Sequence, residues 1–286
     1  MLVIDTDLYI DDVLCLALLP YLGFAADDVI ITTVGSYAPV TETANRAAGL
    51  VQAMAFPAPV FRGADAPWKG LGELPPSLAI PQPSAAIPSI HEATARLESH
   101  PGPIDILGIG PSTNLPLLFD AIAPSRIGRI TLMTGAIFDG HDGQPEAEFN
   151  AARDPEALQD ILRSGLPITL VPLDLCNKVQ IPASRIPNLE QLGTIGPMLI
   201  SAHHALRDET WAQAMIDGVV PYDAVALLVA LYPERFLTAG MQIQVLDSSS
   251  PHPGAFVAEF DDTSPVRVAL GGDIKWARKL LSFPMT

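Results

Sequence analysis

Short apolar runs alternate with amphipathic stretches along most of the chain. The apolar runs lack the polar alternation of a half-solvated sheet, which is typical of parallel strands covered on both faces. The strands predicted in this way are Leu2–Ile4, Val29–Val34, Ile104–Ile109, Ile130–Met133 and Ile168–Val171. The helices predicted between them are Asp12–Leu22, Thr41–Ala55, Ile90–Ser99, Asn114–Ala121 and Asp154–Arg163. This alternation predicts an α/β fold with an open, mainly parallel, Rossmann-like sheet and helices on both faces.

Two segments interrupt the alternation, and the C-terminal part differs from the rest. Pro57–Pro88 is dense in proline without clear periodicity, and Gly135–Pro145 is rich in Gly and Asp, so both are predicted to be loops. Residues 242–268 predict two or three strands in a small C-terminal β region, followed by a helix at Lys275–Leu281. Since there is no internal repeat and no linker, a single domain over residues 1–286 is expected.

Composition excludes several classes of protein. The 286 residues are 49% hydrophobic and 17% charged, which excludes intrinsic disorder. A net charge of −16 argues against nucleic-acid binding, which needs basic surface. The longest apolar runs reach about half of the roughly 20 residues that span a bilayer, so no membrane partner is expected. Cys15 and Cys176 make no disulfide framework, and Asp5 interrupts the N-terminal apolar run too early for a signal peptide, so a cytoplasmic protein is expected.

An acidic cluster follows the first predicted strand. Asp5, Asp7, Asp11 and Asp12 lie within eight residues, at the end of a strand and the start of a helix. Ligands bind at this place in open α/β sheets. Four close carboxylates raise one another's pKa values, and a hard cation such as Ca²⁺ or Mg²⁺ would relieve the repulsion. A solvated acidic helix start accounts for Asp11 and Asp12, but it leaves Asp5 and Asp7 unexplained.

The acidic cluster alone leaves more than one chemistry open. An EF-hand is excluded, because counting from Asp5 places Ile10 where glycine is needed and Leu16 where glutamate is needed. An Asp-x-Asp phosphatase that uses Mg²⁺ stays possible, with Asp5 as nucleophile and Asp7 as general acid. Against it, Leu8 follows where such enzymes usually carry a small or hydroxyl residue.

Three further segments join the acidic cluster in an ordered set. They are Gly110–Asn114 (GPSTN), Ala147–Ala157 (AEFNAARDPEA) and Pro221–Ala226 (PYDAVA). Together with Asp5–Asp12 (DTDLYIDD), they resemble, in order and separation, the motifs of the inosine–uridine-preferring nucleoside hydrolase family. The resemblance covers about residues 1–235.

The resemblance implies a calcium site and a reaction. The implied Ca²⁺ ligands are Asp7, Asp12, Asp223 and the backbone carbonyl of Ile109, with Asp5 orienting them. The implied activity is hydrolysis of the N-glycosidic bond of ribonucleosides to ribose and free base, through an oxocarbenium-like transition state. Asp7 is the candidate general base for a metal-bound water.

The resemblance also implies sugar contacts. Asp11, Glu148 and Asn150 resemble the residues that bind ribose hydroxyls, and Ser36 stands where a family asparagine contacts the ribose or the transition state. A different role is expected for Asp154, which reads with the following proline and glutamate as a helix cap. The family also implies a homodimer or homotetramer.

This chain departs from the family pattern at several positions. Tyr222 replaces the usual histidine, Leu8-Tyr9 replaces Pro-Gly, Ser36 replaces asparagine, and the His-Gly turn near Trp68–Gly72 is missing. Tyrosine, with a pKa of about 10, is a weaker acid than histidine, and losing a general acid costs about 10²–10⁴ in rate. Tyr222 stays a candidate catalytic residue that hydrogen-bonds the base or stacks against it, and a buried structural aromatic whose hydroxyl has found a partner is the alternative. Hydrolysis of a different N-riboside, and a catalytically weak Ca²⁺-dependent sugar or nucleoside binder, stay open as alternatives.

Other reactive side chains are expected to lie outside the chemistry. His203 and His204, on a helical stretch with Trp211, are interpreted as a solvent-facing pair. Cys176 has no evident catalytic partner, and His141 lies in the glycine-rich loop.

Overall fold

A nine-stranded sheet forms the centre of the described chain. The computed structural model describes residues 1–67, 80, 86–138, 147–204 and 217–282. Within these residues the strands are β1 (Leu2–Thr6), β2 (Val29–Gly35), β3 (Val60–Asp65), β4 (Ile104–Gly108), β5 (Ile127–Met133), β6 (Ile168–Val171), β9 (Phe236–Val245), β10 (Phe256–Phe260) and β11 (Val266–Gly272). Their order is β10-β9-β11-β6-β5-β4-β1-β2-β3. The strand β9 pairs antiparallel with both β10 and β11, and the other neighbouring strands pair in parallel.

The central strands can be buried on both faces because their side chains are mostly apolar and their polar side chains form hydrogen bonds. Every position of β1 and β2 is buried. Side chains alternate across a strand, so Val3 packs in the hydrophobic cluster on one face of the sheet and Ile4 in the cluster on the other. Truncating a core residue such as Ile4 to alanine would cost about 2–5 kcal/mol.

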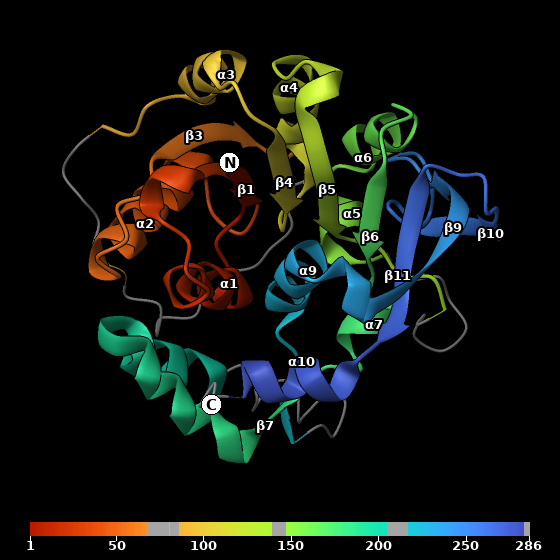
Figure 1. The fold of residues 1–286 in the computed structure, drawn as a ribbon. Coiled ribbons are helices and arrows are strands. Elements are labelled where there is room, and N and C mark those ends of the chain that lie inside the picture. Colours follow the sequence, from red (N-terminus) through yellow and green to blue (C-terminus); the bar gives the residue numbers. More distant parts are fainter. Residues whose placement is uncertain (68–79, 81–85, 139–146, 205–216, 283–286) are drawn as a thin grey trace.

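Helices cover both faces of the sheet (Figure 1). The helices α3, α4 and α6 lie on one face, and α1, α2 and α9 lie on the other. Their bounds, with those of the shorter helices, are α1 (Ile10–Tyr21), α2 (Val40–Ala53), α3 (Ile90–Ser99), α4 (Leu115–Asp120), α5 (Phe149–Arg153), α6 (Pro155–Leu162), α7 (Leu173–Cys176), α9 (Tyr222–Leu231) and α10 (Ile274–Leu281). A small second sheet pairs β7 (Ile181–Pro182) with β8 (Gly218–Val219), and the 3-10 segment η5 (Ala183–Ile195) lies between these strands in the chain.

The predicted α/β class is confirmed, with one correction in the proline-rich region. The prediction of a loop over Pro57–Pro88 is wrong for β3, which pairs in parallel with β2 through Ile31 and Val60. This edge strand is short and only its first two residues are buried, so its apolar signal is weak beside the neighbouring prolines. The three C-terminal strands are present and extend the main sheet, since β11 pairs with β6.

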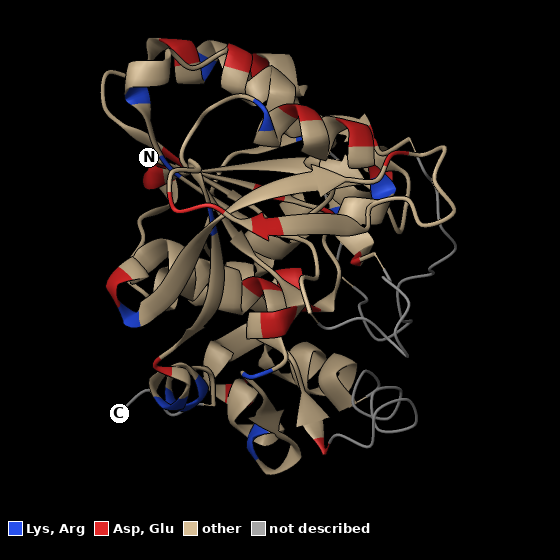
Figure 2. Cartoon of the chain, turned by 90° about the vertical axis from the view of Figure 1, so that its right-hand side faces the viewer, with Lys and Arg blue, Asp and Glu red and all other residues tan. Residues whose placement is uncertain are grey.

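The charge distribution agrees with the acidic composition. Figure 2 shows acidic positions on both helix layers and on the sheet, with basic positions scattered among them. Of the helices that the structure describes, none is long and apolar enough to cross a bilayer.

Candidate active site

The sheet reverses its strand order at β1. From β1 the chain continues to β2 and β3 on one side, whereas β4, β5 and β6 lie on the other side. In open α/β sheets, ligands bind outside the carboxyl ends of the strands at this switch point. Asp5 lies in β1 opposite Gly108 of β4, and the next backbone amide, of Ile109, donates to the Asp5 carbonyl at 2.8 Å. The loops that follow β1 and β4 therefore meet at the place where a ligand site is expected.

Three carboxylates from distant parts of the chain meet beside this switch point. Asp11 and Asp12 belong to the first turn of α1, and Asp223 belongs to the first turn of α9. One carboxylate oxygen of each lies within 4.8 Å of the others. Asp12 and Asp223, both implied calcium ligands, are thus brought together. The third member of this group is Asp11, which the resemblance places on the sugar, and Asp7 is not a member.

The Asp12 carboxylate is held by the turn that precedes α1. The Thr6 hydroxyl donates to its Oδ1, and the backbone amide of Tyr9 donates to its Oδ2 at 2.9 Å. The amide of Leu8 approaches Oδ1 at 3.3 Å. Leu8 has φ +57°, a left-handed conformation that costs an L-residue about 1–2 kcal/mol. In this strained conformation the backbone amides of the turn donate to the Asp12 carboxylate.

Burial raises the pKa of every carboxyl group in the cluster. It raises the pKa of Asp5 to about 7, and burial together with the Asp12 charge raises the pKa of Asp11 to about 7. Burial followed by the Asp12 charge raises the pKa of Asp7 well above its usual range, and burial followed by the Asp11 charge does the same for the pKa of Asp223. Such a cluster is stable only when it takes up protons or a cation.

The donor set fits a hard divalent cation. Oδ2 of Asp5 and Oδ2 of Asp7 are buried without a hydrogen-bond partner among the described residues. A buried carboxylate oxygen without a partner is costly unless it binds something positive. The converging groups are all carboxylates, which suit Ca²⁺ or Mg²⁺ rather than a softer metal.

Asp5 is fixed from two neighbouring strands. Its Oδ1 accepts a hydrogen bond from the Thr32 hydroxyl at 2.6 Å and from the Asn114 side-chain amide at 2.8 Å. The same Asn114 amide nitrogen donates to the Thr33 carbonyl at 3.0 Å. The sequence shows Asn114 only as the last residue of a motif, whereas the structure makes it the tie between Asp5, β2 and the loop after β4.

Glu148 and Asn150 lie beside the site, and both are tied to the protein. Glu148 is the N-cap of α5 and accepts hydrogen bonds from the backbone amides of Gly135, Asn150 and Ala151 and from the Thr134 hydroxyl. The Asn150 side chain donates to the Ile109 carbonyl at 3.3 Å and to the Met133 carbonyl at 3.0 Å. The Ile109 carbonyl, which the resemblance implies as a metal ligand, thus accepts a hydrogen bond from Asn150, which the resemblance implies as a sugar ligand.

Asp154 acts as the helix cap that its sequence context predicts. Its Oδ1 accepts the Ala157 amide at 3.1 Å, and its Oδ2 accepts the Thr113 hydroxyl at 2.8 Å. Pro155 occupies the first helical position of α6. The structural role expected for Asp154 is confirmed.

Ser36 and Tyr222, two of the departures from the family pattern, lie in separate segments of the chain. Ser36 is buried directly after β2, and its hydroxyl partly offsets the rise in the pKa of Asp7. Tyr222 begins α9, and burial followed by the Asp11 charge raises the pKa of its hydroxyl above the ordinary value for tyrosine. In this environment Tyr222 is an even poorer proton donor than a solvated tyrosine.

A stack of aromatic rings, which the sequence did not reveal, joins three loops of the site. Tyr9 and Tyr37 stack with ring centroids 4.3 Å apart, and Tyr37 and Phe149 stack with centroids 4.4 Å apart. We call these three rings the aromatic column. The Arg153 guanidinium lies 4.0 Å from the Phe149 ring centroid. Each stacked pair contributes about 0.5–1.5 kcal/mol beyond area burial.

The histidine interpretation needs a correction. His203 is buried and its Nδ1 lies 2.8 Å from the Leu199 carbonyl, whereas His204 is exposed, so they are not a solvent-facing pair. Burial lowers the pKa of His203 to about 4. The sequence does not distinguish the two positions, because both fit a helical stretch. His141, Trp211 and the turn near Trp68–Gly72 lie outside the described residues.

The fold is an α/β fold, and its buried carboxylates at the sheet's switch point suit a cation. Residues 2–279 match the model of the inosine-uridine preferring nucleoside hydrolase family. The chain belongs to this family, and it is an N-glycosyl hydrolase by class.

Individual relatives agree with this assignment. The non-specific ribonucleoside hydrolase RihC of Escherichia coli O1:K1 is 27% identical over 99% of this chain and 98% of its own length. The RihC of Shigella boydii serotype 18 is 30% identical over 68% of this chain, a match that spans 66% of that relative. A solved purine-preferring ribonucleoside hydrolase from Gardnerella vaginalis has the same fold, with a TM-score of 0.81, 22% identity and coverage of 98% of this chain and 96% of that one.

Proposed function

We propose that this protein hydrolyses the N-glycosidic bond of ribonucleosides in a Ca²⁺-dependent reaction that yields ribose and free base. The observation that carries the proposal is the convergence of Asp11, Asp12 and Asp223, together with the buried oxygen of Asp7 that has no hydrogen-bond partner among the described residues. Asp12 and Asp223, with Asp7 and the Ile109 carbonyl, are the groups that would hold the ion. When bound, Ca²⁺ supplies positive charge that makes water more acidic and attracts sugar hydroxyl oxygens.

The chain's own residues then supply binding and proton transfer. Asp7 accepts the proton of the attacking water, for which its raised pKa, once lowered by a neighbouring cation, is suited. Asp11 accepts a hydrogen bond from a ribose hydroxyl. Glu148 and Asn150 bind the sugar on the opposite side, and the α5 cap fixes both. The negative charges of Asp11 and Glu148 stabilise the positive charge that develops on the sugar.

The leaving group decides between two substrate classes. Tyr222 stands where the family has histidine, and its half-buried side chain, whose hydroxyl pKa is raised by burial, donates a proton poorly. This favours, as a second candidate, an N-riboside whose base departs without being protonated. Tyr222 then contacts the base rather than protonating it. A sugar or nucleoside binder with little turnover is the third outcome.

A substrate panel separates these functions. Purified protein is stripped with EDTA, reloaded with Ca²⁺ or Mg²⁺, and assayed for reducing sugar on purine nucleosides, pyrimidine nucleosides and N-ribosides with cationic bases. We expect release of ribose with Ca²⁺, and a loss of at least about 10³-fold in kcat for Asp7→Asn. Ribose binding in calorimetry without any turnover would favour the binder, and Mg²⁺-dependent phosphate release with phosphorylated Asp5 would favour a phosphatase.

The assembly and location of the protein stay predictions. The resemblance implies a homodimer or homotetramer, and sedimentation of the purified protein tests it.

A further inference from the structure

The aromatic column connects three loops that each carry proposed site residues. Tyr9 lies between Asp7 and Asp11 in the turn after β1. Tyr37 directly follows Ser36 in the loop after β2, and Phe149 lies between Glu148 and Asn150 at the start of α5. Each ring belongs to a different loop, so the column bridges segments that no continuous secondary structure joins.

The ring faces inside the column are used for contact between the rings. Centroid distances of 4.3 and 4.4 Å, with interplanar angles of 16° and 7°, leave no space for a planar base between neighbouring rings. Tyr37 is the middle ring, and both of its faces are covered. Its role is therefore to hold the loops rather than to stack on a substrate.

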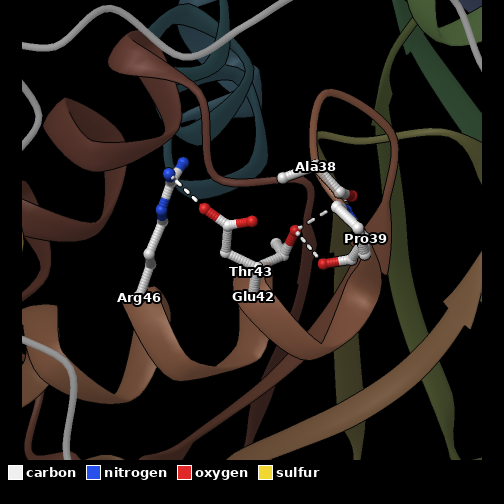
Figure 3. Close-up of polar contacts among 5 residues, drawn as sticks. All are labelled: Ala38, Pro39, Glu42, Thr43 and Arg46. Carbon is white, nitrogen blue, oxygen red and sulfur yellow. Dashed lines mark hydrogen bonds and ion pairs between the residues drawn. The ribbon is translucent and has the colours of Figure 1, made fainter.

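The loop that carries Tyr37 is anchored at its other end by the start of α2. Asp65 Oδ1 accepts the Val40 amide at 2.8 Å. Figure 3 shows the Thr43 hydroxyl directed at the carbonyls of Ala38 and Pro39, at 3.5 and 3.4 Å. These contacts hold the loop after Tyr37, and the Tyr37 ring ties this loop to the turn after β1 and to α5.

We propose that Tyr37 is a positioning residue for the hydrolase reaction: as the central ring of the aromatic column, it holds the adjoining residue Ser36, an implied sugar contact, in its buried position. The inference rests on the proposed function. The family pattern has asparagine where this chain has the shorter serine, and a short side chain reaches its target only when its backbone is fixed. Tyr9 is itself part of a departure from the family pattern, Leu8-Tyr9, and Tyr37 directly follows another departure, Ser36.

A kinetic double-mutant cycle tests the proposal on the full-length protein with Ca²⁺. The variants are Tyr37→Leu, Tyr37→Phe, Ser36→Ala and Tyr37→Leu/Ser36→Ala, assayed with the best nucleoside substrate. Displacing a reacting group by about 1 Å can cost 10²-fold, so we expect kcat/KM to fall about 10-fold for Tyr37→Leu and for Ser36→Ala. Because Tyr37 acts through Ser36, the double variant should be no slower than Ser36→Ala alone. Tyr37→Phe keeps the ring and should stay within about twofold of wild type.

A control variant and the contrary results separate this inference from the proposed function. Tyr232→Leu removes a half-buried ring that lies edge-on to Trp276, at 5.1 Å, and should leave kcat/KM unchanged. If the wild type is active, three results would overturn the role of Tyr37 but not the proposed function. The first is that the losses in kcat/KM of the two single variants multiply in the double variant. The others are that Tyr37→Leu has the kcat/KM of wild type, or that Tyr37→Phe loses as much kcat/KM as Tyr37→Leu. A wild type that neither hydrolyses nor binds nucleosides would overturn the proposed function, and this inference with it.

Discussion

The side-chain amide of Asn114 donates a hydrogen bond of 2.8 Å to Oδ1 of Asp5. The bond joins β1 to the loop after β4 at the point where the strand order reverses. Because Asp5 is fully buried, this donor both secures the carboxylate and ties together the two segments from which the site is built. The site is thus supported by groups that need not contact substrate.

Removing the Asn114 amide should destabilise the fold. Asn114→Ala leaves Asp5 with the Thr32 hydroxyl and an under-satisfied buried oxygen, which costs about 1–3 kcal/mol. The free energy of unfolding in urea measures this loss. Asn188→Ala, which removes a half-buried amide bonded to the Ser282 carbonyl at 2.9 Å, is the matched control and should cost less. Equal stabilities for wild type and Asn114→Ala would refute the supporting role.

The metal-free protein should become less stable as the pH rises from about 4 to about 7. Asp5 and Asp11 have folded pKa values of about 7, above the value of about 4 for unfolded aspartate, so the folded state binds more protons in this window. The free energy of unfolding then falls with increasing pH, by up to about 1.4 kcal/mol per pH unit for each group, and levels off above pH 7. Urea titrations in EDTA from pH 4.5 to 8 measure the slope.

Calcium should weaken this pH dependence. A cation favours the ionised carboxylates, so its stabilisation grows toward neutral pH, reaching about 2.7 kcal/mol at 100 times Kd. The comparison uses the same titrations with Ca²⁺ added. A stability that rises with pH in EDTA, or a Ca²⁺ effect that is independent of pH, would contradict the account.

Removing the charge of one of the three converging carboxylates, Asp11, Asp12 and Asp223, should weaken metal binding. Asp223→Asn keeps the shape of the side chain but removes a charge from the cluster, so we expect calcium affinity in calorimetry to fall about 10–100-fold. Asp154→Asn removes a charge from the cap of α6 and serves as control, because an asparagine cap preserves the helix start. Similar affinities for Asp223→Asn and Asp154→Asn would argue against an ion at Asp223.

Tyr222 should matter for base contact more than for proton donation. With its hydroxyl pKa raised by burial, Tyr222→Phe should keep kcat within about threefold, whereas Tyr222→His should raise kcat on ordinary nucleosides by up to about 10²-fold. Steady-state assays on inosine and uridine give both values. A collapse of kcat in Tyr222→Phe, with KM unchanged, would instead identify the hydroxyl as the acid.

The sequence predicts the layers of this fold better than the details of its site. The strand β1 is visible because the run Leu2–Ile4 is apolar on both faces, and the predicted bounds of α3 (Ile90–Ser99) match those of the structure. β3 escaped prediction because an edge strand buries few residues and here begins among prolines. The order of the motifs indicated the family, which the family match over residues 2–279 confirms.

The sequence did not predict the aromatic column or the grouping of the three carboxylates of Asp11, Asp12 and Asp223. Tyr9, Tyr37 and Phe149 follow three different strands, and periodicity within one element carries no information about rings that meet between loops. The grouping of Asp11 with Asp12 and Asp223 depends on the side-chain directions at two helix starts. Motif order assigned Asp11 to the sugar, a role that remains a proposal.

The most direct test of the central claim is the position of calcium in a crystal grown with Ca²⁺, recorded at a long X-ray wavelength at which calcium scatters anomalously. The account predicts one strong anomalous peak within about 2.6 Å of carboxylate oxygens of both Asp12 and Asp223. Fully occupied crystals with no peak at these residues, or with calcium bound only elsewhere, would contradict it.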